Sequence, residues 1–346
     1  FGCPITKMTI PDSVEEIGGG AFYGTEVFEV GDTSAGKYRT DVNNTVLIEK
    51  NTNTLVAAAK TVSKVPEGVQ AIGAYAFAWN PMSTIDLPDT VTQIGEYAFY
   101  NCCNLKSIDL SAVTEIGDQA FCMYEDEYED TAVYNVLSSV KLGAAKIGDY
   151  AFAGTALDSV DLSQVKELGK NVFSNCGKLS SVTWIPNVDV VPDGTFSACG
   201  SLKEIKGLSA KKVGAAAFSG CEVLQTDVVS KVTEIGVSAY RNCGAVKKTI
   251  DLSDVTAIGA GAFASCGVLE EVVWPAALTT ISASTFSRCN NLKQINIAKV
   301  KKVEDEAFIN CENLQLDDLS AIEEIGEYTF EGCNSLTKVN LSSAVK

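Results

Sequence analysis

Histidine is absent from this chain of 346 residues, and the basic residues number 27 against 44 acidic ones. The absence of histidine excludes Ser-His-Asp and Cys-His nucleophile pairs, His-ligated zinc and histidine general-base chemistry. A carboxylate pair or a Lys-activated Cys stays formally open, but nothing distinguishes such a pair among the acidic residues, so we expect no enzyme. The net charge of −17 argues against nucleic acid and anionic membrane surfaces as partners. No run of eighteen apolar residues occurs, so we expect no membrane-spanning segment.

A repeat of about 22 residues runs along almost the whole chain. Thirteen aromatic residues anchor it: Phe22, Phe77, Phe99, Phe121, Phe152, Phe173, Phe196, Phe218, Tyr240, Phe263, Phe286, Phe308 and Phe330. Five residues before each anchor stands an aliphatic residue, followed by Gly in ten units, and three residues after it stands a Cys in nine. A period of this length indicates stacked supersecondary units, each too small to bury its own apolar face. The sequence therefore predicts a solenoid.

Each unit contains one segment with the alternation of a β-strand. In Leu105-x-x-Ile108-x-Leu110 the apolar side chains would point into the core, while Ser107 and Asp109 would face outward. Stacking the units places these strands side by side in a parallel sheet. The segment Gly-x-x-Ala-Phe is too short for a stable α-helix, so we expect a single helical or 3₁₀ turn on the opposite side.

Two insertions interrupt the period. The first, residues 29–65, carries β-branched runs separated by Asn43-Asn44 and by Asn51-Thr52-Asn53, which predicts hairpins forming an excursion from the solenoid. The second, residues 122–139, is an acidic loop. Insertions in repeat proteins often lie on the binding face. Asp227 and Asp317 replace inward aliphatic residues, so their strands should bulge or shift register by one residue.

The repeat resembles the BspA-type leucine-rich repeat, also called the Treponema pallidum type, whose unit reads L-x-x-I-x-I-P-x-x-V-x-x-I-G-x-x-A-F-x-x-C. The stretches 105–121 and 269–289 reproduce this unit closely, and the resemblance covers essentially all 346 residues. It implies a single leucine-rich-repeat solenoid over residues 1–346. This would be a curved right-handed stack of about 13–14 repeats of 21–23 residues, with a parallel β-sheet on the concave face and short helical or 3₁₀ turns on the convex face. It also implies a secreted or surface-displayed protein of a host-associated bacterium, active in adhesion or surface recognition.

The nine repeated cysteines could suggest a metal array, a redox array or disulfides. A zinc site needs four ligands round one ion, whereas these thiols come one per coil, and Thr25, Asn80 and Thr155 fill the same slot elsewhere. Parallel stacking also disfavours the disulfide geometry. We therefore expect a ladder of small buried thiols, with Cys103 and Cys122, which lie outside it, as the exposed ones.

Two further features have an alternative interpretation. The acidic residues between Glu125 and Asp130 could hold Ca²⁺, but they lack the EF-hand spacing, and a solvated loop is the simpler hypothesis. Trp184 and Trp274 could stack on a ligand, yet both occupy inward strand slots and should belong to the core. Trp79 should be exposed. We expect no cofactor and no metal.

The expected partner surface is the outward row of the strands together with the insertions. The candidate residues are Ser107, Asp109, Ser139, Lys141, Ser181, Thr183, Glu204 and Lys206 on the strands and Tyr124, Tyr128 and Tyr134 in the acidic loop. The row is small, polar and mixed in charge, without the aromatic residues that anchor tight interfaces, which predicts weak multivalent contact.

The leading functional hypothesis is a non-catalytic, monomeric, extracellular adhesion module that binds a host or neighbouring-cell protein. A rigid spacer that displays other domains and a carbohydrate-binding module are the alternatives. Because neither end of the chain has the polar character of a capping repeat, we expect it to be a piece of a longer protein.

Overall fold

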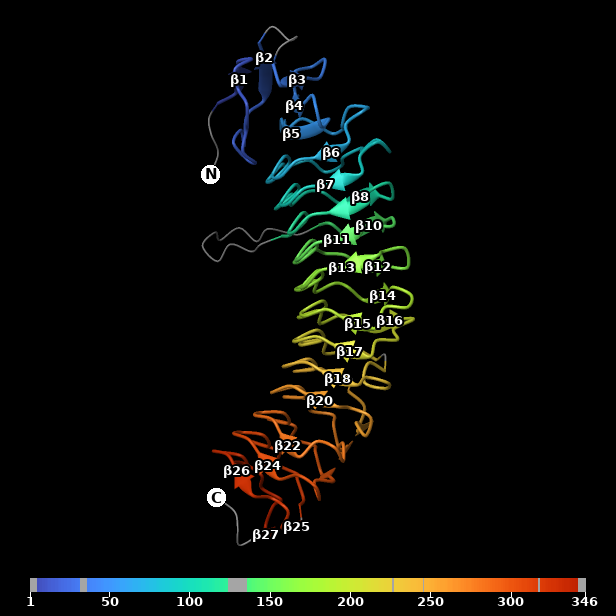
Figure 1. Ribbon diagram of the computed structural model, residues 1–346, viewed down its shortest axis with the longest axis vertical. Coiled ribbons are helices and arrows are strands. Elements are labelled where there is room, and N and C mark those ends of the chain that lie inside the picture. Colours follow the sequence, from blue (N-terminus) through green and yellow to red (C-terminus); the bar gives the residue numbers. More distant parts are fainter. Residues whose placement is uncertain are drawn as a thin grey trace. The chain divides into compact units, whose positions relative to one another are not determined.

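The computed structural model describes residues 5–31, 36–123, 136–225, 227–244, 246–316 and 318–341 (Figure 1). The backbone divides into two units, residues 1–176 and 177–346. Each unit is a stack of coils whose strands pair with the strands of the neighbouring coils. No helix in the described ranges is long and apolar enough to cross a membrane.

Unit 1 contains two rows of parallel strands. The longer strands β8 (Ser107–Leu110) and β10 (Ser139–Leu142) pair in register, and β12 (Ser159–Asp161) follows in the next coil. The second row, which was not predicted, is formed by short strands at the Val-x-x-Ile-Gly step. It contains β6 (Ala71–Ile72), β7 (Gln93–Ile94), β9 (Glu115–Ile116), β11 (Lys146–Ile147) and β13 (Glu167–Leu168).

The first insertion continues this second row instead of leaving the solenoid. Strands β3 (Tyr38–Thr40), β4 (Val46–Glu49) and β5 (Thr54–Ala58) pair antiparallel through the turns at Asn44 and Asn53, and β5 then pairs parallel with β6. One eight-stranded sheet results. At the start of the unit, β1 (Lys7–Ile10) pairs parallel with β2 (Val27–Val30).

Unit 2 repeats the two-row arrangement, and the strand pairs in its described residues are parallel. The longer row contains β14 (Ser181–Thr183), β16 (Glu204–Lys206), β19 (Thr249–Asp251), β21 (Glu271–Val273), β23 (Gln294–Ile295), β25 (Asp318–Leu319) and β27 (Asn340–Leu341). The second row contains β15 (Val190–Val191), β17 (Lys212–Val213), β18 (Glu234–Ile235), β20 (Ala257–Ile258), β22 (Thr280–Ile281), β24 (Lys302–Val303) and β26 (Glu324–Ile325).

The anchor aromatics form the centre of the core. In unit 1 the ring centroids of Phe77, Phe99 and Phe121 follow one another at 5.0 Å, with the planes within 5° of parallel. In unit 2 the centroids of Phe196 and its successors are 5.4–5.8 Å apart. Rings of this size contribute a large buried apolar area each, so the repeat is held together by one aromatic residue per coil.

The helical turns expected opposite the strands are absent from the described residues, and that prediction was wrong. Between Gly95 and Cys102 the backbone N–H groups alternate between two kinds of acceptor. Those of Ala98 and Tyr100 close turns within their own coil, whereas those of Phe99 and Asn101 donate to carbonyls of the next coil, at 2.8 and 3.1 Å. Because every second N–H is used between coils, the bonds within a coil are isolated i to i−3 turns, and the consecutive bonds of an α-helix or a 3₁₀-helix cannot form.

Eight of the nine repeated cysteines are buried, as predicted, and Cys333 is partly exposed. The structure also shows that these thiols make hydrogen bonds. The Sγ of Cys102 lies 3.0 Å from the carbonyl oxygen of Phe77, the anchor of the preceding coil, and Cys289 repeats this with Phe263 at 3.1 Å. The expected exposure of Cys122 was wrong: its exposed fraction is 7%, while Cys103 is partly exposed. Trp184 and Trp274 lie in the core, and Trp79 is exposed, as predicted.

The coil that carries Asp227 departs from the repeat, although not through the bulge or one-residue register shift that the sequence predicted. In the described residues of this coil no strand of the longer row is formed, so that row passes from β16 to β19. The Asp227 carboxylate instead accepts the N–H groups of Val229 and Ser230, and it pairs with Lys247. The buried hydroxyl of Tyr240, which stands where most coils have Phe, donates to the Val228 carbonyl at 2.5 Å. Asp317 lies outside the described residues.

Candidate functional site

The predicted strand-face residues of unit 1 are brought together, but they neutralise one another. Ser107 stands beside Ser139, and Asp109 stands beside Lys141, with 3.1 Å between carboxylate and ammonium. The Asp109 carboxylate also accepts the N–H and the hydroxyl of Ser111, at 2.9 and 2.6 Å. These hydrogen bonds and then Lys141 hold the pKa of Asp109 below its usual value. An ion pair this exposed contributes little to the free energy of folding. Because Asp109 and Lys141 already bind each other, neither is free to bind a ligand.

The strand-face residues of unit 2 show the same self-pairing. Ser181 lies beside Glu204 and Thr183 beside Lys206, while the Lys206 ammonium is 3.6 Å from the Glu204 carboxylate. Ser181 and Thr183 are only half-exposed. The charged groups of Glu204 and Lys206 therefore contact each other within the single strand β16.

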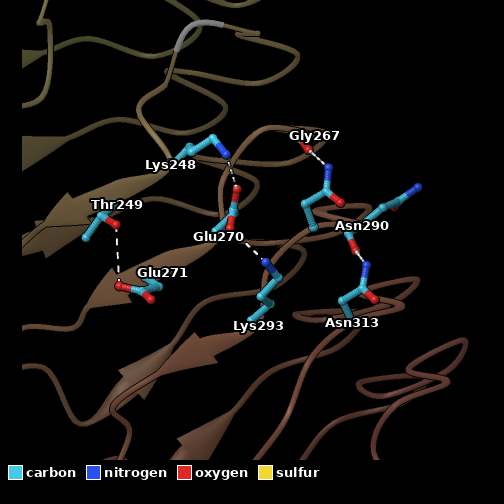
Figure 2. A network of polar contacts seen from close by, with 9 residues as sticks. Lys248, Thr249, Gly267, Glu270, Glu271, Asn290, Lys293 and Asn313 are labelled. Carbon is cyan, nitrogen blue, oxygen red and sulfur yellow. Dashed lines mark hydrogen bonds and ion pairs between the residues drawn. The ribbon is translucent and has the colours of Figure 1, made fainter.

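A ladder of polar contacts continues beside the strands β19, β21 and β23 (Figure 2). Glu270 lies between Lys248 and Lys293, which approach its carboxylate to 2.7 and 2.8 Å. These two ammonium groups lower the pKa of Glu270 to about 2. Asn313 donates from its side chain to the carbonyl of Asn290 at 2.8 Å (Figure 2). The contacts run from one coil to the next, so they order the stack and leave few free groups for a ligand.

The three loop tyrosines predicted as aromatic contacts, Tyr124, Tyr128 and Tyr134, lie outside the described residues. In the part of the chain that the structure describes, no group of three or more Cys, Asp or Glu side chains is arranged to hold a metal ion.

The structure reveals a cluster of aromatic side chains on the turns of unit 1, which we call the aromatic cluster. It comprises Tyr23, Tyr75, Trp79, Tyr97 and Tyr100. Trp79 lies edge-on between Tyr23 and Tyr100, with both centroid distances 5.3 Å. Tyr97 stacks on Tyr75 at 4.6 Å and meets the edge of Tyr100 at 5.4 Å. The exposed fraction of Trp79 is 41%, and the four tyrosines are half-exposed.

The repeat register explains why these rings meet. Tyr75 and Tyr97 stand two residues before their anchors, and Tyr100 stands one residue after its anchor. Tyr75, Trp79 and Tyr97 have backbone φ angles of 55–58°, in the left-handed region that few bulky residues adopt. The coil of Phe22 stacks directly on that of Phe77 at this side, although 55 residues separate the two anchors. Sequence analysis found only Trp79. The insertion separates Tyr23 from Trp79 in the sequence, whereas Tyr75, Tyr97 and Tyr100 could have been found from their positions beside the anchors.

The surroundings of the aromatic cluster suit a surface contact better than a buried ligand. The ammonium of Lys60 lies 5.8 Å from the centroid of the Tyr23 ring, a favourable cation–π distance. Burial raises the pKa of Tyr23 and of Tyr75, so both phenols are neutral at physiological pH. The neighbouring cavity between these coils measures only about 20 Å³, enough for about one water molecule.

Comparison with known proteins identifies the family. The pattern of the BspA type leucine rich repeat region matches residues 1–33, 59–144, 128–247 and 256–346. The chain belongs to the BspA-type leucine-rich repeat family. Its two units are therefore leucine-rich-repeat solenoid segments. A typical repeat has one anchor aromatic residue, one strand of the longer row and one strand of the second row. No curated protein sequence matches this leucine-rich repeat chain.

Three solved structures are similar to this chain, and the two with a TM-score above 0.5 support the fold. A leucine-rich repeat protein from Bacteroides ovatus is 24% identical, with 89% of this chain and 88% of that chain covered and a TM-score of 0.64. One from Eubacterium ventriosum is 18% identical, with 89% and 91% covered and a TM-score of 0.51. A leucine rich cell surface protein from Faecalibacterium prausnitzii is 20% identical, with 88% and 95% covered and a TM-score of 0.43.

Proposed function

We propose that this chain is a non-catalytic recognition module of a bacterial surface protein, and that it binds a partner protein through the aromatic cluster. The observation that carries the proposal is the group of five rings on one side of unit 1, of which Trp79 is exposed and the four tyrosines are partly exposed. Tyr and Trp dominate the energetics of protein interfaces because they bury much area while losing little side-chain entropy. A chain selected only as a spacer has no physical reason to leave five aromatic rings partly exposed at one place.

The strand face has a secondary role in this proposal. Its side chains are polar, and the pairs Asp109–Lys141 and Glu204–Lys206 satisfy each other. Such groups form the rim of an interface more readily than its centre. The loop tyrosines Tyr124, Tyr128 and Tyr134 stay predicted contacts.

Two other functions keep specific support. The self-paired polar strand faces favour the spacer, since a spacer needs no ligand surface. Exposed rings can also stack on sugars, so the aromatic cluster would equally serve a carbohydrate-binding module. Extracellular display, which the family resemblance implies, fits all three.

The test is surface plasmon resonance of the chain against a panel of extracellular-matrix proteins and neutral glycans. The variant is Trp79→Ala, and the matched control is Tyr328→Ala, a tyrosine with an exposed fraction of 62% on the corresponding turns of unit 2. We expect saturable binding to one protein that weakens at least about tenfold in Trp79→Ala, as for a typical hot-spot residue, and that Tyr328→Ala leaves unchanged.

Three outcomes separate the alternatives. Binding to no member of the panel supports the spacer. Binding that Trp79→Ala does not alter rejects the aromatic cluster as the contact surface. Binding to glycans but to no protein, lost in Trp79→Ala, assigns the carbohydrate function instead.

A further inference from the structure

A groove of about 380 Å³ lies on the turns of unit 2, and two arginines line it. Arg241 follows the anchor Tyr240 directly, and Arg288 stands two residues after the anchor Phe286. Both side chains are exposed. One coil, that of Phe263, separates their coils, so the two positions are about 10 Å apart at the usual spacing of parallel strands. We call this feature the arginine groove.

The guanidinium groups of the arginine groove have no acidic partner among the described residues. The ion pairs found in those ranges all use lysine as the cation, for example Lys212 with Glu234 at 2.7 Å and Lys301 with Glu323 at 2.6 Å. The chain has only three arginines, and the third, Arg39, donates to the side chain of Asn53 at 3.5 Å. In a chain with a net charge of −17, two cations left without a partner beside one groove form a local site for anions.

The lining of the groove between the two arginines is small and rich in hydroxyl groups. It includes Gly261, Ala264, Ser238, Ser265 and Ser287. In the described ranges the hydroxyls of these three serines have no hydrogen-bond partner. They are therefore available to the hydroxyl groups of a ligand.

The backbone of the groove, in contrast, is already paired. The N–H of Ser265 donates to Ser287 at 2.7 Å, and that of Arg288 donates to Ile309 at 2.7 Å. Ser287 donates within its own coil to Ser284 at 3.0 Å. An extended peptide gains most of its affinity from backbone pairing at a sheet edge, which these N–H groups do not offer. Recognition here depends on side chains.

We propose that the arginine groove binds a saccharide that carries carboxylate groups. Each guanidinium matches a carboxylate through two parallel hydrogen bonds, and the serine hydroxyls pair with the sugar hydroxyls between them. Because two guanidiniums stand about two coils apart, an oligosaccharide with repeated uronic acids fits better than one with a single terminal acid. This site goes beyond the proposed protein contact, since it lies in the other unit and does not use the aromatic cluster.

Glu306 also lines the groove, and its carboxylate accepts a hydrogen bond from the Ser284 hydroxyl at 3.3 Å. It forms no ion pair with either arginine among the described residues. Its negative charge opposes an anionic ligand and limits the affinity. The substitution Glu306→Gln should therefore strengthen binding, a result that damage to the fold would not produce.

The experiment is titration calorimetry of the whole chain with oligogalacturonate, and with the fully methyl-esterified form of the same oligosaccharide as the neutral control. We expect the free acid alone to bind, more weakly at higher salt. Arg241→Gln and Arg288→Gln should each lower the affinity about tenfold or more, Glu306→Gln should raise it, and Arg39→Gln should leave it unchanged. Circular dichroism confirms that the variants are folded.

Further ligands show which kind of molecule carries the carboxylate, and they can refute the proposal. Sialyllactose, compared with lactose, tests a terminal acid; equal Arg-dependent binding of sialyllactose would support the carboxylate chemistry with a sialylated source. Poly-glutamate that binds as well as oligogalacturonate, with the same Arg dependence, would overturn the saccharide in favour of an acidic peptide. Absence of binding, or binding unaffected by both arginine substitutions, would overturn the site.

Discussion

The glycine that follows the aliphatic residue of most repeats should be required by steric contact between coils. At Gly259 an added Cβ would lie 2.4 Å from the backbone nitrogen of Val237 and 2.7 Å from the carbonyl carbon of Gly236. Both atoms belong to the backbone of the preceding coil, so no side chain can turn away to make room. Gly259→Ala should therefore push two coils apart.

The size of the effect follows from these distances. Ordinary contact begins near 3.4 Å, so the coils must separate locally by roughly 1 Å. That movement stretches the inter-coil hydrogen bonds from Gly259 to Ile235, now 2.9 Å, and from Thr256 to Thr233, now 2.8 Å. Overpacking of this kind costs about 1–3 kcal/mol, and each weakened hydrogen bond adds up to about 1 kcal/mol. We expect Gly259→Ala to lower the free energy of unfolding by about 3 kcal/mol.

The matched control is Gly267→Ala in the same repeat, because nothing lies within 4 Å of the Cβ added there. Removing a glycine from the unfolded chain should make this variant about 0.5 kcal/mol more stable. Equilibrium unfolding in urea, followed by circular dichroism, measures both. If the two variants unfold at the same urea concentration, the inter-coil contact does not determine the glycine and the reasoning is refuted.

Three further predictions concern the thiols and the coil of Tyr240. Under native conditions iodoacetamide should label Cys103 and leave Cys102 and Cys176 unlabelled until the protein is unfolded, as mass spectrometry of the digest would show; equal labelling would contradict their burial. Burial raises the pKa of Cys102 and of Cys176 from 9.0 to about 12, so only the unfolded state loses these protons between pH 9 and 12. The free energy of unfolding should therefore be fully retained below pH 9 and should then fall by about 1.4 kcal/mol per thiol and pH unit. Urea unfolding at several pH values measures this fall. A Cys176→Thr variant should show a shallower fall, and an unchanged slope would contradict the buried thiols as its cause. Tyr240→Phe restores the usual anchor but leaves the buried Val228 carbonyl without its donor, which should cost about 1–2 kcal/mol in the same assay; a variant as stable as wild type would show that the carbonyl finds another partner.

The periodic part of the fold was predictable because a repeat applies the same physical constraint many times. The spacing of Phe, Ile and Leu indicated the core and the longer strands, and it placed Trp184 and Trp274 inside. The departure at Asp227 was also visible, since a carboxylate in an inward slot cannot be buried unpaired. One substitution against a strict period is easier to interpret than the same residue in an irregular chain.

Non-periodic neighbourhoods were not predictable. Tyr23 meets Trp79 only because the coils on either side of the first insertion stack directly on the turn side, while strands β3 to β5 extend the sheet on the other. Cys122 was expected to be exposed because it stands outside the cysteine ladder, yet neighbouring coils cover it. The turns were expected to be helical from their length. They are not helical, because half of their backbone N–H groups donate to carbonyl oxygens of the next coil.

By itself the sequence determined the solenoid, its register and its aromatic core, because these follow from apolar spacing along one chain. It also determined the absence of histidine chemistry and the negative net charge. Only the tertiary structure decided which polar residues pair with each other and which stay free. Asp109 and Lys141 neutralise one another, whereas Arg241 and Arg288 form no ion pair with an acidic residue in the described part of the chain. That difference depends on the distance between side chains in adjacent coils, which the sequence period does not specify.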